Sequence, residues 1–203
     1  MNIAQAHTVV TAAARDDAGS FYGSTEGLAL GAGIVLADVE FPAYQPNEDR
    51  FVVWAGLVLV LSHECDLDQD NQRLLNDLAL ICPVRRLEAL VEMAADAGYD
   101  DNALTAFLGN LASRRVSRAV YLPPLPDVLP YGGFIYLNQF THTSVRRLMA
   151  DVARPVTALS AYAMQSVDYA LLGHLHRSKS DQLPLTRASL RRGITITSAS
   201  KPS

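Results

Sequence analysis

A histidine and a cysteine stand two residues apart, directly after an apolar run of strand character. The stretch from Val58 to Asn71 reads VLVLSHECDLDQDN. A thiol attacks as the thiolate, which needs a nearby base or cation. On a continued strand His63 and Cys65 project to one side, while the acidic neighbours face the other. One hypothesis is therefore a thiol site of His63, Cys65 and Asp66, with His142 as a second candidate base. The alternative is a small buried cysteine beside a hydrogen-bonded loop histidine.

The same residue types could also bind a metal ion. Four of them could in principle supply zinc ligands: His63, Cys65, Cys82 and His142. No C-x-x-C or H-x-x-x-H spacing supports such a site. The aspartates are spaced like early EF-hand ligands, but the sixth position is Asn71 instead of glycine. The acidic loop could also hold Mg²⁺, although a solvated acidic turn is the simpler interpretation. We therefore predict no metal site and no cofactor.

A second candidate site is basic and aromatic. Arg114, Arg115 and Arg118 precede Tyr121, and Tyr131 follows ten residues later. Arginine and aromatic side chains together form surfaces that bind single-stranded RNA. The alternative is a helix end whose arginines satisfy its C-terminal carbonyl groups.

Composition limits the class of protein. The chain has 203 residues, of which 49% are hydrophobic and 19% are charged, and its net charge is −4. The negative charge argues against a protein covered in phosphate contacts. We expect no membrane span, because the longest apolar run is too short, and no secretion signal. With two cysteines the chain is expected to be a reduced, cytoplasmic protein, and its Ala/Arg-rich usage suggests a bacterial or phage source.

The elements that position these residues follow from the period of the apolar residues. β-branched or continuous apolar runs predict strands at 33–41, 51–62, 77–84, 118–124 and 132–140. We expect Pro42 to end the first strand. Helical periodicity appears at 3–15, twice within 85–115, after THTS as far as Met149, and at 160–178.

The strand motifs resemble a known family. The stretches GAGIVLADVEF, QPNEDR, AGLVLVLS and DLALICPV, within about residues 31 to 85, follow the order and spacing seen in MazF/PemK-type toxins. The resemblance implies a small SH3-like barrel, often dimeric, which in the family cleaves single-stranded RNA. Two positions depart from it. The family's catalytic arginine would precede the second strand, where this chain has FVVWAG and its nearest arginine is Arg50. The hydroxyl residue expected after the third strand is replaced by Arg85.

We expect one α+β domain over residues 1–180. It consists of a small, strongly bent antiparallel SH3-like barrel with helices inserted at about 85–115 and a C-terminal helix outside. Residues 181–203 are expected to form a loose tail.

Two functions remain open. One is an RNA-directed protein of MazF/PemK-like architecture, either an endoribonuclease toxin or a catalytically degenerate form. The other is a non-catalytic module that binds a protein partner, and a Cys/His thiol hydrolase is a more remote third. We also expect a homodimer, because the 160–178 helix has an apolar stripe and further apolar residues away from it. The stripe comprises Met164, Val167, Leu171, Leu172 and Leu175, and the further residues are Tyr162, Tyr169 and Ala170.

Overall fold

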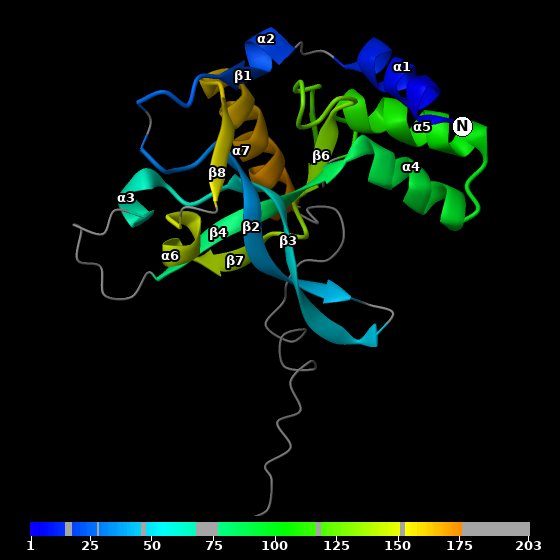
Figure 1. The fold of residues 1–203 in the computed structure, drawn as a ribbon. Coiled ribbons are helices and arrows are strands. Elements are labelled where there is room, and N and C mark those ends of the chain that lie inside the picture. Colours follow the sequence, from blue (N-terminus) through cyan, green and yellow to red (C-terminus); the bar gives the residue numbers. More distant parts are fainter. Residues whose placement is uncertain are drawn as a thin grey trace, which may run out of the picture.

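The computed structural model describes residues 1–14, 18–27, 29–45, 48–67, 77–116, 119–150 and 153–175. They form a mixed α+β structure in which one curved antiparallel sheet carries helices at its sides (Figure 1). The predicted tail at 181–203 lies outside the described residues. No helix in the described ranges combines the length and the apolar character needed to cross a bilayer.

The strands are β1 Tyr22–Gly23, β2 Ile34–Gln45, β3 Arg50–Val60, β4 Leu78–Arg86, β5 Ala119–Leu122, β6 Gly133–Tyr136, β7 Thr141–Ser144 and β8 Arg154–Leu159. They pair in the order β1-β8-β2-β3-β4-β6-β5, and β7 pairs separately with β4. All pairs between these strands are antiparallel, as the absence of β-α-β alternation in the sequence predicted. The α+β class is therefore confirmed.

The sheet does not close into the expected barrel. Closure needs a ladder of backbone hydrogen bonds around the whole ring. Among the described strands, no such ladder joins β7 to β2. Side chains bridge them instead, because the hydroxyl groups of Thr141 and Thr143 donate to the carbonyl oxygens of Pro42 (3.1 Å) and Glu40 (2.9 Å). The strands are strongly bent, but the architecture is an open, curled sheet.

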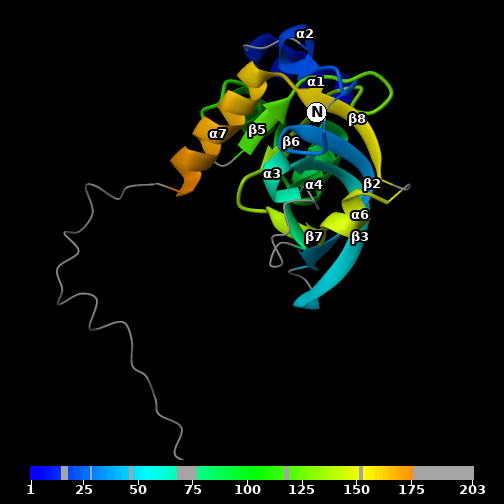
Figure 2. The ribbon, with the colours of Figure 1, turned by 90° about the vertical axis from the view of Figure 1, so that its left-hand side faces the viewer.

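The helices are α1 Ile3–Ala13, α2 Ala18–Phe21, α3 Glu64–Leu67, α4 Leu87–Asp96, α5 Asp101–Ala112, α6 Val145–Leu148 and α7 Ala161–Leu175. The insertion predicted at 85–115 is present as α4 and α5, and α1 packs against both around Leu87, Leu104 and Leu108. Helix α7 lies on the other side of the molecule from β2 and β3 (Figure 2). Its buried residues Ala163 and Val167 join the core formed by Leu59, Cys82 and Leu122.

Several strand boundaries differ from the prediction, and two of these differences matter for the site. Strand β2 does not stop at Pro42 but continues to Gln45, with Pro42 opposite Val53. Proline is tolerated here because β2 is an edge at this point and its missing N–H is not needed by a ladder. Strand β4 continues three residues past Pro83, where it changes partners: Pro83 faces Val58 on β3, and Val84 faces Ile135 on β6.

Candidate functional site

The structure brings His63 and Cys65 together, although through a helix turn and not a continued strand. Short helix α3 starts at Glu64, and the thiol sulfur Sγ of Cys65 lies 3.3 Å from Nδ1 of His63. The backbone N–H of Asp66 donates to the carbonyl of His63 (3.0 Å). Both His63 and Cys65 are exposed, and Asp66 is half-buried. The arrangement is an exposed thiol–imidazole pair; residues 68–76, which continue the acidic loop, lie outside the description.

The four proposed zinc ligands are in different environments. Cys82 is buried in the sheet, its thiol donates to the carbonyl of Tyr136 (3.3 Å), and burial raises the pKa of the thiol to about 12. His142 is exposed on β7 opposite Leu80. Within the described part of the chain, no group of three or more His, Cys, Asp or Glu side chains is placed to hold a metal ion.

The predicted RNA-binding residues do not form one exposed surface. Tyr121 is only 6% exposed, and burial raises the pKa of its phenol to about 12. Arg114 donates to the hydroxyl of Ser166 (3.0 Å), and its guanidinium lies 5.8 Å from the ring centre of Tyr162. These contacts attach the end of α5 to α7. Arg115 is exposed, and Arg118 lies outside the described residues.

A different candidate surface is the hairpin of β2 and β3. Strand β3 pairs with β4 only from Val58 to Val60, so its residues 50–57 rest on β2 alone. The free half of the hairpin extends beyond the rest of the sheet (Figure 1). We call residues 41–45 and 50–56 the arm. The arm carries large apolar side chains that are exposed to solvent: Phe51 is 73% exposed and Trp54 is 44% exposed. The ring centres of Tyr44 and Phe51 lie 5.4 Å apart across the two strands, with the ring planes tilted by 56°.

A cavity opens where the arm separates from β4. After Pro83 removes a backbone donor, β4 turns to β6 and runs into α4, while β3 continues into the arm. The space between them has a volume of about 540 Å³. Trp54 on the arm forms one wall, and the first turn of α4 forms another. We call this the charged cavity, because seven charged side chains line it: Asp38, Arg85, Arg86, Glu88, Glu92, Asp127 and Arg154.

Arg85 is the central residue of this region. It is half-buried, and its guanidinium lies 4.8 Å from the centre of the Trp54 ring, a cation–π contact. Burial lowers the pKa of the Arg85 guanidinium, which nevertheless stays charged at neutral pH. Among the described residues Arg85 forms no ion pair. A partly desolvated cation with no carboxylate partner in the described part of the chain is an unusual feature, because such charges are normally paired.

Arg85 also lines a second cavity, of about 300 Å³, together with Pro83. Its walls carry the aromatic rings of Tyr44, Phe51 and Phe140 and the amides of Asn138 and Gln139. We call it the aromatic cavity. The two cavities share Pro83 and Arg85 in their lining.

Two aspartates in the charged cavity have strained backbones. Asp38 has a φ of 60° and sits in the β-bulge of β2 between Leu36 and Val39, and Asp127 has a φ of 63°. Aspartate tolerates this left-handed region better than most residues, and bulges commonly re-aim side chains beside functional sites. Both carboxylates are exposed at the cavity.

Sequence reasoning missed Trp54 and Arg85 as a pair. Both appeared only as departures from the family motifs, and no local pattern reveals the contact because the two residues are 31 positions apart. The available signal was a lone tryptophan at the outer end of a strand whose partner ends in two arginines.

The sequence matches no protein-family model, and no curated protein matches it.

Proposed function

We propose that the protein binds single-stranded RNA along the arm, with Arg85 lining two nucleotide-sized cavities. The observation that supports this most is the half-buried Arg85 guanidinium, which stacks on exposed Trp54 and has no ion pair in the described part of the chain. Exposed aromatic rings next to an arginine are the usual platform for unstacked bases and their phosphates.

The expected contribution of each stacked base to the free energy of RNA binding is modest. Stacking of one base on an aromatic side chain contributes about 1–3 kcal/mol, judged by alanine substitution. With a net charge of −4, the protein offers few phosphate contacts beyond the arginines of the charged cavity. One to three contacts with single-stranded RNA would give a slope of roughly −0.7 to −2 in log affinity against log salt. The expected binding is short-range and weakly salt-dependent.

The resemblance to MazF/PemK-type toxins supports an RNA ligand but not cleavage. The family's arginine and hydroxyl positions are not matched here, and Arg85 occupies the hydroxyl position. We therefore propose a catalytically degenerate, RNA-binding relative of that architecture, acting in a bacterial or phage cytoplasm. The exposed His63–Cys65 pair is not needed for this function.

The test is fluorescence anisotropy with labelled single-stranded RNA hexamers. We expect Arg85→Ala to weaken binding about tenfold, because it removes both the phosphate contact and the stack on Trp54. Arg85→Lys should recover only part of the loss, since an ammonium group is a point charge without the planar fork. Arg115→Ala, an exposed arginine outside both cavities, is the matched control and should change affinity less than twofold. Equal losses for Arg85→Ala and Arg115→Ala would contradict the proposed location.

A protein-binding role is the second candidate, favoured by the apolar outer face of the arm. Val53 is exposed there, as are Tyr44 and Phe51, which also line the aromatic cavity. Monomeric proteins rarely expose large contiguous apolar patches, and such patches commonly bind partners. Val53→Asp distinguishes the two functions, because Val53 lines neither cavity. A protein partner on this face would be lost in that variant, whereas RNA binding through Arg85 would persist.

A further inference from the structure

We propose that the open edge of strand β3 in the arm binds residues 193–197 of the same chain, GITIT, as an added β-strand. This segment belongs to the tail at 181–203, outside the described residues. The inference stands apart from the proposed RNA binding, because its test uses no RNA. It depends on the direction of the backbone groups along β3, on the residue types of that edge, and on the charge and length of the tail.

The backbone groups of every second residue of β3 in the arm point away from β2. The carbonyl oxygens of Glu40 and Pro42 accept hydrogen bonds from threonine hydroxyls of β7, so they point away from β3. Their register partners on β3 are Ala55 and Val53. In an antiparallel pair, two opposite residues either exchange both backbone hydrogen bonds or exchange none. Ala55 and Val53 therefore exchange none with β2, and their N–H and C=O groups point to the other edge of β3.

No strand lies beside that edge in the described part of the chain. Strand β4 pairs with β3 only from Val58 to Val60 and then turns to β6. By the same alternation, Phe51 joins Val53 and Ala55, and all three are exposed. We call Phe51, Val53 and Ala55 the edge residues. Their N–H and C=O groups form a row without a described partner strand, and such a row is a template for one further strand.

The sequence of this edge lacks the features that usually protect one. Natural edge strands carry charges, prolines or bulges, or another element covers them. Residues 51–61 read FVVWAGLVLVL, with no charge and no proline. The other strand of the arm, β2, is protected, because it contains Pro42 and because threonine hydroxyls of β7 bond to its carbonyl groups. An open, apolar and uncharged edge is expected to be covered by a strand.

Residues 193–197 have the composition of such a strand. Isoleucine and threonine alternate from Ile194 to Thr197, and the segment contains neither a charge nor a proline. Both residue types are β-branched and favour strands. Charge also favours docking of the tail on the body. Residues 176–203 contain six Lys or Arg and one aspartate, so they carry a formal charge of +5, whereas residues 1–175 carry −9.

The tail is long enough to reach the arm. Helix α7 lies on the other side of the molecule from β2 and β3 (Figure 2), and residues 176–192 connect it to the segment. These residues can span up to about 55 Å, whereas a folded body of about 175 residues has a diameter of about 40 Å. Tethering gives the segment an effective concentration on the order of 1 mM. Weak strand pairing is then sufficient, whereas a separate peptide or a second copy must bind at its own lower concentration.

Amide hydrogen exchange of the full chain, followed residue by residue by NMR, tests the inference. We expect the N–H groups of the edge residues to exchange about tenfold more slowly in the wild type than in Ile194→Pro/Thr195→Pro. The double substitution covers both possible registers, because one of two successive residues faces β3 and proline donates no hydrogen bond. Ala199→Pro/Ser200→Pro, with two prolines beyond the segment, is the matched control and should keep the slow exchange.

The alternation along β3 provides an internal check. The N–H groups of Val52 and Trp54 face β2 and should exchange slowly in every variant. Fast exchange of the edge residues in the wild type would overturn the proposal, since nothing then covers the edge. Slow exchange that persists in Ile194→Pro/Thr195→Pro would also overturn it, and protection that rises with protein concentration would identify a second copy as the occupant. Equal loss of protection in the control variant would remove the role of GITIT.

Discussion

At the scale of single residues, Cys65 and Cys82 place the same thiol group in opposite environments. Cys65 is exposed, with Nδ1 of His63 at 3.3 Å from its sulfur. Cys82 is buried in the sheet, and burial raises the pKa of its thiol to about 12. The thiolate is the nucleophile, and an alkylating reagent must also be able to reach it. The two thiols should therefore differ greatly in their rate of alkylation.

We predict that iodoacetamide at pH 8 alkylates one thiol rapidly in the native protein and the second only after unfolding. Because the pKa of Cys82 is raised, its thiolate stays scarce at pH 9, and its native-state rate should remain low as the pH rises to that value. Mass spectrometry of the alkylated protein identifies the residue. Cys65→Ser should abolish the rapid phase, and His63→Ala should slow it by removing the proton acceptor. Rapid alkylation of Cys82 in the native state would contradict its placement.

The sequence allows prediction of local pairs much better than of distant ones. His63 and Cys65 are two residues apart, so their meeting was predictable whether the chain formed a strand or a turn. The contact of Trp54 with Arg85 depends on β4 leaving β3 at Pro83, a tertiary event that no spacing encodes. Tyr121 was predicted to be at the surface, but its strand is covered by the helical insertion, which buries the ring.

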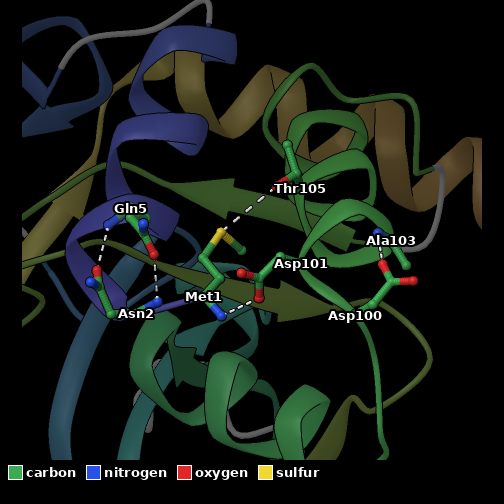
Figure 3. Close-up of polar contacts among 7 residues, drawn as sticks. All are labelled: Met1, Asn2, Gln5, Asp100, Asp101, Ala103 and Thr105. Carbon is green, nitrogen blue, oxygen red and sulfur yellow. Dashed lines mark hydrogen bonds and ion pairs between the residues drawn. The ribbon is translucent and has the colours of Figure 1, made fainter.

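At the scale of elements, side-chain caps stabilise the N-terminal ends of helices α1 and α5. The side-chain oxygen of Asn2 accepts from the N–H of Gln5, and the side-chain oxygen of Gln5 accepts from the N–H of Asn2, both at 2.9 Å (Figure 3). The carboxylate of Asp100 accepts from the N–H of Ala103 at 2.7 Å. Two further contacts, from Met1 to Asp101 and Thr105, attach α1 to α5 (Figure 3). Capping therefore supports the helical layer that forms one side of the charged cavity.

We predict that Asn2→Ala and Asp100→Ala each lower the free energy of unfolding by about 1 kcal/mol, the usual contribution of an N-cap. Denaturant titration followed by circular dichroism measures the change. Asn2→Asp should restore most of the loss, because aspartate also accepts the capping hydrogen bond. Thr11→Ala, an exposed position on α1 outside the cap, is the control and should not destabilise the protein. A loss in Thr11→Ala as large as that in Asn2→Ala would argue against capping as the cause.

Among the elements, long periodic segments were predictable and short polar ones were not. The apolar runs located β3 and β4, and helical periodicity located α4, α5 and α7. Strand β7 is the polar tetrapeptide THTS, whose residue types locally indicate a helix cap. Ser144 does cap α6, because its Oγ accepts a hydrogen bond from the backbone N–H of Arg147 (3.2 Å). Strand β8 begins Arg-Pro and was not predicted. Both pair through partners far away in the sequence, which overrides their weak local preference.

At the scale of the whole molecule, part of the apolar surface of helix α7 is buried within its own chain. Ala163 and Val167 are fully buried, and Met164 and Leu171 pack against the same core. Tyr162, Tyr169 and Leu172 remain exposed, with Tyr169 at 68%. The side chain of Leu175, expected in the stripe, lies outside the description. These exposed residues are the surface through which we continue to predict a homodimer.

Sedimentation velocity at micromolar concentration tests the assembly. We predict a species of twice the 22.0 kDa chain mass, because the exposed apolar face of α7 would be buried between two copies. Tyr169→Asp should shift the population to monomer by placing a charge in that interface. Tyr99→Asp, also at an exposed tyrosine but outside α7, is the matched control and should leave the dimer intact. A wild-type protein that sediments as a monomer would refute the prediction.

In the proposed complex with RNA, a base stacks on Trp54 beside Arg85. Trp54 is the single tryptophan of the chain, so the intrinsic tryptophan fluorescence reports on this site alone. We predict that unlabelled single-stranded RNA hexamer quenches this fluorescence in a saturable titration, and that Arg85→Ala requires about tenfold more RNA for half the effect. Fluorescence that stays unchanged while RNA binds by anisotropy would place the RNA elsewhere and contradict the account.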